Sequence, residues 1–262
     1  TVTKRIADRL GAEAPAIETA APVSAGAVPK EVPFDPDAYE KISEPQALQV
    51  WIDRINERGY VAVDTETTAL NEMRAELVGI SLCVEPGQAC YIPLTHKATS
   101  QDDLFGSGAR AEGQMDFDAC LRMLEPVLAD PAVMKIGQNM KYDAKIFAGL
   151  GLVVDPVDDT MLMSYAMHGG LHNHGMDLLA ERYLGHVPIP IKPLLGSGKS
   201  AITFDKVPMD DAVPYAAEDA DITLRLWQAF KPQLHRAGVT TVYETLARPL
   251  VPVLAQMEMS GV

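Results

Sequence analysis

Residues 61–70 read VAVDTETTAL and set two acidic side chains, Asp64 and Glu66, one residue apart beside a run of small apolar residues. This composition predicts a β-strand, in which successive side chains point to opposite faces. The two acids then share one face, while Val61 and Val63 point to the other. Two carboxylates about 4 Å apart repel each other by about 4 kcal/mol at an effective dielectric constant of about 20. A cluster of four such acids would therefore be hard to keep ionised without cations.

The segments around this strand predict an α/β fold, a mixed sheet flanked by helices. Three strands follow one another closely enough for an antiparallel meander, with Pro86 and Gly87 as the turn between the second and the third. The expected strands are YVAVDTE (60–66), LVGISLCVE (77–85), ACYIPL (89–94) and AVMKIG (132–137). The other expected elements are a helix over 45–58 that ends at Gly59, a polar Gly-rich loop over 99–114, and helices over 117–128, from about Asn139, and from about Asp211 into the 230s.

The bulk composition excludes several classes of protein. The 262 residues are 47% hydrophobic and 22% charged, which is typical of a globular chain. No apolar run approaches the roughly 18 residues of a membrane span, and no secretory signal is recognisable, so we expect a cytoplasmic protein. The three cysteines are too irregularly spaced for a zinc site, and their odd number argues against a disulfide framework.

The formal net charge of −14 argues against broad, sequence-independent wrapping of a nucleic-acid backbone, which depends on Lys and Arg. It does not exclude a nucleic-acid enzyme, because acidic clusters hold metal ions that then meet the phosphate.

Two later patches repeat the acidic theme at helical spacing. Asn139 and Asp143 are four residues apart in NMKYD, and Tyr215 and Asp219 are four residues apart in YAAED. Residues at this spacing are neighbours on one face of a helix. A lone Asp-x-Glu after a strand is usually a turn or a solvated face, and a Tyr and an Asp at this spacing are more often a surface pair. The order, types and spacings of the three patches together favour a functional site.

The stretches VAVDTETTAL, NMKYD and YAAED resemble the three motifs of the DEDD superfamily of 3′-5′ exonucleases, in the branch with tyrosine in the third motif. Over about residues 45–262 the chain resembles the proofreading domain of bacterial family A DNA polymerases, DNA polymerase I. The resemblance implies a ribonuclease H-like fold. It also implies hydrolysis of a mismatched 3′ nucleotide with two divalent metal ions, Mg²⁺ or Mn²⁺.

By motif match, the four metal-binding acids are Asp64, Glu66, Asp143 and Asp219, with Asp64 as the bridge between the two ions. In such a site one ion lowers the pKa of the attacking water, and the other stabilises the leaving 3′ oxygen. Tyr215 would position that water, because a phenol with a pKa near 10 is a poor general base at neutral pH.

The resemblance also implies contacts with the terminal nucleotides for Leu70, Asn139, Lys141 and Tyr142. These contacts would be wedging, hydrogen bonding or stacking on bases. The alternatives are core packing for Leu70 and a helix-surface aromatic for Tyr142. Asn173 stands where the family tends to have an arginine, so the phosphate contact that the arginine makes in the family does not carry over to this chain by motif match, and catalysis need not suffer.

The resemblance divides the chain into three parts. We expect a flexible linker over residues 1–40, a 3′-5′ exonuclease domain over 41–237, and the start of a polymerase domain over 238–262. A 5′-nuclease domain would precede the linker, and the polymerase would follow. The expected partners are the 3′ end of single-stranded DNA and the polymerase domain of the same chain, with no membrane contact and a monomeric state.

Two other functions share these residues. A ribonuclease D-type enzyme that trims RNA uses the same acids and tyrosine, and some relatives keep a non-catalytic exonuclease fold as a spacer. The linker and the polymerase-like end disfavour the first, and five intact motif residues disfavour the second.

Two further motifs have simpler explanations. In GSGKS (196–200) the position that a phosphate-binding loop needs as glycine is Pro193. The trio His168, His172 and His174 could be read as a metal site, but a polar Gly-rich loop explains it more simply.

Overall fold

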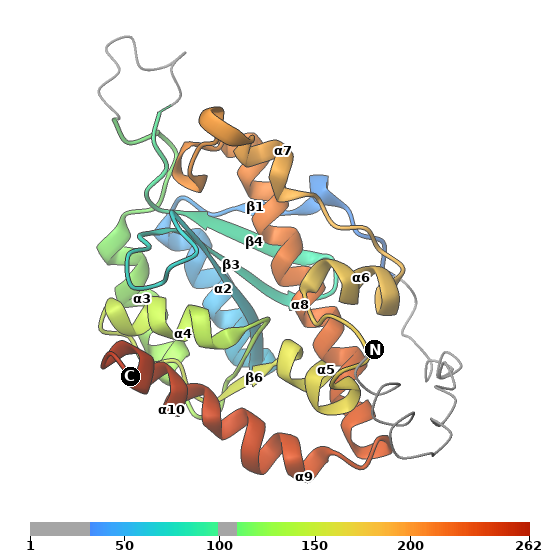
Figure 1. Ribbon diagram of the computed structural model, residues 1–262. Helices are drawn as coiled ribbons and strands as arrows, with labels where there is room; N and C mark the ends of the chain where they lie inside the picture. Colours follow the sequence, from blue (N-terminus) through green and yellow to red (C-terminus); the bar gives the residue numbers. More distant parts are fainter. Residues whose placement is uncertain (1–31, 99–108) are drawn as a thin grey trace. The chain divides into compact units, whose positions relative to one another are not determined.

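The computed structural model describes residues 32–98 and 109–262. Most of the predicted linker and part of the predicted Gly-rich loop therefore lie outside the described residues. Within the described part, six strands form one mixed sheet in the order β1-β4-β3-β2-β5-β6 (Figure 1). The strands are β1 (Glu40–Lys41), β2 (Tyr60–Thr67), β3 (Leu77–Glu85), β4 (Gln88–Pro93), β5 (Met134–Gly137) and β6 (Val157–Asp159).

The helices follow the strands in a pattern that confirms the predicted α/β class. The α-helices are α2 (Pro45–Arg58), α3 (Phe117–Ala129), α4 (Met140–Gly149), α5 (Thr160–His168), α6 (Met176–Leu184), α7 (Ile191–Leu195), α8 (Met209–Arg236), α9 (Thr240–Val242) and α10 (Arg248–Met259). Short 3₁₀ turns are η1 (Pro36–Ala38), η2 (Gly198–Ser200) and η3 (Phe204–Lys206), and η4 (Tyr243–Ala247) is a π-helical turn.

The predicted meander is confirmed, because β2 pairs antiparallel with β3, and β3 antiparallel with β4. Gly87 at the predicted turn has a φ of 79°, a left-handed value that glycine adopts without strain. Strands β5 and β6 extend the sheet in parallel, and β1 pairs in parallel with β4. The strands β1 and β6 were not predicted, because two and three residues are too few to show an alternating pattern.

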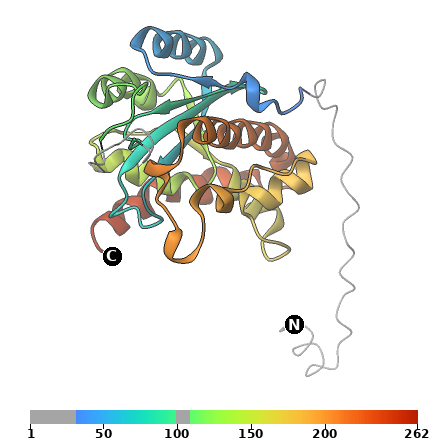
Figure 2. The ribbon, with the colours of Figure 1, turned by 90° about the horizontal axis from the view of Figure 1, so that it is seen from above.

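The two faces of β2 bury different side chains, as the alternation predicts. Val61 and Val63 belong to a core formed with α2, α3 and α4. Ala62 on the opposite face packs with Ala217 and Ala220 of α8. Figure 2 shows α2 and α3 on one side of the sheet and α8 on the other. Small side chains at this contact let α8 approach the acidic face of β2 closely.

The C-terminal helices pack onto the rest of residues 33–262, which form one compact unit. The hydroxyl of the buried Tyr243 donates to Oδ1 of Asp158 at 3.0 Å. Val251 of α10 packs against Met140 and Val157. The domain boundary at residue 238 stays a prediction. Within the described residues, no helix combines the length and the apolar character that crossing a lipid bilayer requires.

Candidate active site

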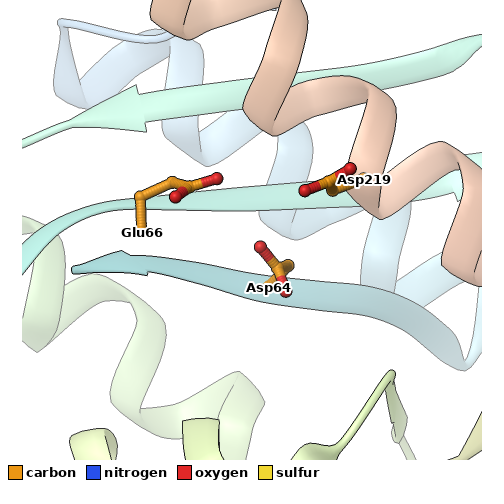
Figure 3. A group of neighbouring side chains, drawn as sticks. All are labelled: Asp64, Glu66 and Asp219. Carbon is orange, nitrogen blue, oxygen red and sulfur yellow. The ribbon is translucent and has the colours of Figure 1, made fainter. Parts of the chain in front are cut away.

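Three carboxylates from two elements meet above the central strand. Asp64 and Glu66 project from the same face of β2, and Asp219 projects from α8, which crosses that face (Figure 3). A carboxylate oxygen from each of the three lies within 4.8 Å of the others. The structure therefore brings together three of the four acids that the motifs assign to metal binding.

The fourth predicted acid, Asp143, lies beside this trio. It is buried on α4, and its Oδ1 accepts hydrogen bonds from the backbone N–H of Thr65 at 3.1 Å and from the Thr65 hydroxyl at 2.6 Å. Thr65 lies between the two acids of β2 and points to the opposite face of the strand, which α4 covers. The negative charge of Asp143 still contributes to raising the pKa of Glu66.

Burial and mutual repulsion make the four carboxylates hard to ionise. Burial raises the pKa of Asp64 from its ordinary 3.8 to about 6. Burial first, and then the charge of Asp64, raises the pKa of Asp143 and of Asp219 well above the ordinary range. Among residues 32–98 and 109–262, no lysine or arginine forms an ion pair with any of the four. The cluster therefore needs protons or cations from solution.

The donor set fits a hard divalent cation. Carboxylate oxygens are the ligands that Mg²⁺ and Mn²⁺ prefer, and such ions keep room for water and phosphate oxygens. The trio of Asp64, Glu66 and Asp219 forms the one group in the described residues whose side chains could jointly hold an ion. The cluster thus fits the metal chemistry expected from the sequence.

Tyr215 lies one helical turn before Asp219 on α8 and is half-buried. Burial, followed by the negative charges of Asp219, Glu66 and Asp64, raises the pKa of its phenol above the ordinary value of 10. The hydroxyl therefore keeps its proton at neutral pH and can donate a hydrogen bond. Its ring centroid lies 5.8 Å from that of Phe204, which is buried in η3.

The predicted substrate contacts surround the α4 side of the site. Leu70 is 95% exposed, so the alternative of core packing is wrong. Tyr142 is half-buried, and its hydroxyl donates to the carbonyl of Ala69 at 2.6 Å. Lys141 forms an ion pair of 2.5 Å with Glu258 of α10. The side chain of Leu70 is thus accessible to a ligand, whereas the hydroxyl of Tyr142 and the ammonium of Lys141 already have partners within the protein.

Asn139 precedes α4 with a left-handed φ of 66°. Its backbone N–H and that of Met140 donate to the two oxygens of Asp159, at 3.1 and 3.0 Å. The side chain of Asn139 remains exposed at the start of the helix. Asn173 is also exposed, and its Oδ1 accepts from the backbone N–H of Gly175 at 2.7 Å.

The sequence patterns do not reveal three residues that shape the site. Thr65 holds Asp143, Asp159 holds the turn at Asn139, and the buried Lys145 pairs with Glu72. Asp159 carries a helix-cap signal, because it is an acid directly before α5. Nothing local signals its bond to Asn139, and nothing local signals the contacts of Thr65 and Lys145.

The two rejected motifs do not gain support. No strand leads into GSGKS, because α7 precedes it and η2 begins inside it. The ring centroid of His172 lies 5.5 Å from that of His168 and 4.9 Å from that of His174. In the described part of the chain, however, the three histidines do not form a group whose ligand atoms converge on one ion.

Comparisons with known proteins agree with this geometry. A family model described as 3′-5′ exonuclease matches residues 39–235. DNA polymerase I of Rhizobium leguminosarum is 47% identical over 240 residues, which cover 88% of this chain and 23% of that protein. This chain therefore spans less than a quarter of the length of that relative.

Several solved structures share the fold. Brucella melitensis NrnC bound to pGG has a TM-score of 0.62 and 21% identity, covering 85% of this chain and 93% of that chain. Escherichia coli RNase D, an exoribonuclease involved in structured RNA processing, has a TM-score of 0.57 and 17% identity, covering 84% of this chain and 50% of that chain. These likenesses confirm the predicted ribonuclease H-like fold. With the family model and the sequence identity, they lead to one conclusion: the chain belongs to the 3′-5′ exonuclease family of the DNA polymerase I proteins.

Proposed function

We propose that this chain hydrolyses the 3′-terminal nucleotide of single-stranded or mismatched DNA, as the proofreading part of a DNA polymerase I in replication and repair. The observation that carries the proposal is the meeting of Asp64, Glu66 and Asp219 within 4.8 Å, with Asp143 beside them. Within the described residues these four acids, three of them buried and Asp64 half-buried, form no ion pair with a lysine or arginine, and such a cluster is costly to keep unless it binds cations, as a metal-dependent nuclease requires.

Asp64, Glu66 and Asp219 would hold one divalent cation, and Asp143 would help to hold a second, with Asp64 shared between them. Mg²⁺ or Mn²⁺ suits these ligands. When bound, such ions lower the pKa of a water and stabilise the charge on the leaving 3′ oxygen. The acids themselves would hold the ions against β2 and α8, two elements packed into the core.

Tyr215 would orient the attacking water. Its phenol stays protonated at neutral pH, because burial and the neighbouring carboxylates raise its pKa. It therefore acts as a hydrogen-bond donor to the water and does not take the proton.

The terminal nucleotides would lie against Leu70, Asn139, Lys141 and Tyr142. Leu70 offers an exposed apolar side chain, and Asn139 offers an exposed amide. Because the hydroxyl of Tyr142 is bound to Ala69, the ring of Tyr142 is the part left for stacking on a base. Lys141 would meet a phosphate only by leaving Glu258.

The proposed setting is a longer chain. The Rhizobium leguminosarum relative is a DNA polymerase I of which this chain matches 23%, which supports a polymerase domain as the covalent partner. We place the protein in the cytoplasm and treat the chain as monomeric.

Hydrolysis of RNA is the second candidate, and the likeness in fold to Escherichia coli RNase D favours it. The identity of 47% to a DNA polymerase I weighs more than a likeness in fold at 17% identity. A non-catalytic spacer is disfavoured, because the four acids and Tyr215 are all present and three of the acids meet.

The test is digestion of 3′-labelled DNA and RNA oligonucleotides of one sequence, with Mg²⁺, with Mn²⁺ and with EDTA. Asp64→Ala removes a proposed metal ligand, and Asp118→Ala, an exposed acid on α3, is the matched control. We expect metal-dependent loss of DNA in the wild type and in Asp118→Ala only. A preference for RNA would support the second candidate, and activity that survives in Asp64→Ala would overturn the site assignment.

A further inference from the structure

The loop between β2 and β3, residues 68–76, presents Leu70 to the site and is called the Leu70 loop below. Its two ends are joined, because Thr68 N–H donates to Glu76 O at 3.0 Å and Glu76 N–H donates to the Thr68 hydroxyl oxygen at 3.0 Å. Asn71 orders the interior by accepting from the backbone N–H groups of Met73 and Arg74. These bonds shape the loop, but they do not set its position against the rest of the site.

Helix α4 holds the Leu70 loop at two points, one on each side of Leu70. On one side, the Tyr142 hydroxyl donates to Ala69 O at 2.6 Å. On the other side, the ammonium of Lys145 pairs with the carboxylate of Glu72. Asp143 projects from the same helix, so the element that carries a catalytic acid also holds the loop that carries Leu70.

Lys145 is an unusual residue for this position. Its side chain is only 3% exposed, and a buried ammonium is costly unless it is paired. Its ammonium has two partners, the carboxylates of Glu72 and Glu258. The hydrogen bond from Lys145 leads the causes that lower the pKa of Glu72. The buried ammonium and the Glu72 carboxylate therefore form an ion pair.

We propose that Lys145 is a positioning residue, which fixes the Leu70 loop through Glu72 against the helix that carries Asp143. This inference rests on the proposed exonuclease function and deepens it. A loop held before the substrate arrives loses less conformational entropy on binding, so more of the contact energy of Leu70 contributes to affinity. Leu70 would touch the terminal nucleotide and not the reacting atoms. The ion pair between Lys145 and Glu72 should therefore affect KM more than kcat.

The structure supplies a matched control. Glu258 of α10 pairs with the same ammonium as Glu72, but it belongs to the C-terminal helix and makes its other ion pair with Lys141. Glu72→Gln and Glu258→Gln thus each remove one carboxylate charge from Lys145. Only Glu72→Gln removes the ion pair between α4 and the Leu70 loop.

The experiment compares wild type, Glu72→Gln, Glu258→Gln and Lys145→Met as the whole chain, each checked for folding by thermal unfolding. Hydrogen exchange of a peptide spanning residues 68–76 reports on the loop. Steady-state digestion of a 3′-labelled single-stranded DNA oligonucleotide with Mn²⁺ reports on KM and kcat. We expect Glu72→Gln and Lys145→Met to speed hydrogen exchange of residues 68–76 about tenfold, because the Leu70 loop then opens locally more often.

In the same two variants we expect KM to rise about three- to tenfold with kcat within about twofold, the pattern of lost ground-state binding. Glu258→Gln should not speed exchange, and because it releases Lys141 for a phosphate contact, it should leave KM unchanged or lower it. In a Leu70→Ala background the effect of Glu72→Gln on KM should disappear, because the two substitutions then remove one and the same contact.

Three results would overturn the proposal: unchanged exchange in Glu72→Gln, an equal effect of Glu258→Gln, or a rise in KM that persists without Leu70. Failure of the proposed function would look different. A wild type that leaves DNA intact would refute the exonuclease activity, while the exchange of residues 68–76 would still decide whether Lys145 holds the loop.

Discussion

At the scale of single residues, the main feature of the site is the electrostatic repulsion among neighbouring carboxylates. Asp64, Glu66 and Asp219 place oxygens within 4.8 Å of one another, and burial leads the causes that raise the pKa of each. The folded protein therefore concentrates negative charge where water does not fully screen it. A divalent cation would offset this charge, and without one the repulsion acts in the folded state only.

The stability of the metal-free protein should fall as the pH rises from about 4 to about 7. The pKa of Asp64 is about 6 in the folded state against its ordinary 3.8, so the folded state binds more protons in this range. Stability then decreases with pH, by about 1.4 kcal/mol for each unit of pKa difference that is crossed. Thermal unfolding in EDTA measures this fall, and Asp64→Asn should reduce it and be the more stable protein at pH 7. Added Mn²⁺ should stabilise the wild type. Equal pH dependence in the two proteins would contradict the charge argument.

Tyr215→Phe should lower kcat by about 10- to 100-fold, the loss that follows when a reacting group is misplaced by about 1 Å. Metal binding should persist, because the four carboxylates are unchanged. Single-turnover digestion of labelled DNA measures the rate, and titration calorimetry with Mn²⁺ measures the metal. A variant that lost metal binding and rate together would assign Tyr215 to the shape of the cluster and not to the water.

At the scale of elements, the acidic face of β2 depends on how closely side chains pack on the neighbouring strands β3 and β4 of the same sheet. Gly79 of β3 is paired with Glu66 of β2. The ring of Tyr91 from β4 fills the space beside Gly79, where a Cβ would lie 2.2 Å from the Tyr91 hydroxyl oxygen. The Tyr91 hydroxyl is itself bound to His96 at 2.8 Å. Glycine is needed here for close approach and not for an unusual backbone angle.

Gly79→Ala should therefore destabilise the fold by about 1 to 3 kcal/mol, the usual cost of overpacking a core. It should also lower activity, because Tyr91 can move aside only by disturbing the strand next to Glu66. Gly149→Ala is the control, since a Cβ at Gly149 of α4 meets nothing within 4 Å. Chemical denaturation and DNA digestion of both variants test the pair. Equal stability of Gly79→Ala and Gly149→Ala would show that the Tyr91 ring can move aside at little energetic cost.

At the scale of the whole molecule, the net charge of −14 leaves few cations for a polyanion. Close to the site, Lys141 and Lys145 both pair with Glu258. Under the proposed function, DNA would then be held mainly through bound metal, through Leu70 and through ring contacts, with little displacement of counterions.

Binding of single-stranded DNA should accordingly depend weakly on salt. For contacts to one or two phosphates, the slope of log K against log salt is about −0.7 to −1.4. Fluorescence anisotropy with an oligonucleotide that resists hydrolysis, at constant Mg²⁺, measures the slope. Lys141→Met should make it shallower. A slope steeper than about −4 would contradict this expectation and would indicate contacts with several more phosphates.

Much of this architecture can be predicted from local patterns. The alternation in VAVDTETTAL separates Val61 and Val63 from the acids, and the two cores on either side of β2 agree with it. The helical spacing of Tyr215 and Asp219 places both on α8 as expected. These predictions succeed because alternation along a strand and the turn of a helix are properties of the backbone, repeated at every residue.

Other features depend on elements that are distant in sequence. Local periodicity does not predict the contact between Thr65 and Asp143 or the ion pair between Lys145 and Glu72, because each joins residues more than 70 positions apart. It also does not predict that Leu70 is exposed. The short strands β1 and β6 likewise exist only because a neighbouring strand accepts them. VAVDTETTAL was enough to show two acids on one face of a strand. Packing of α8 over that face brings Asp219 to them, and packing of α4 on the other face turns Asp143 toward Thr65, because the position of a side chain across the core depends on every element packed between.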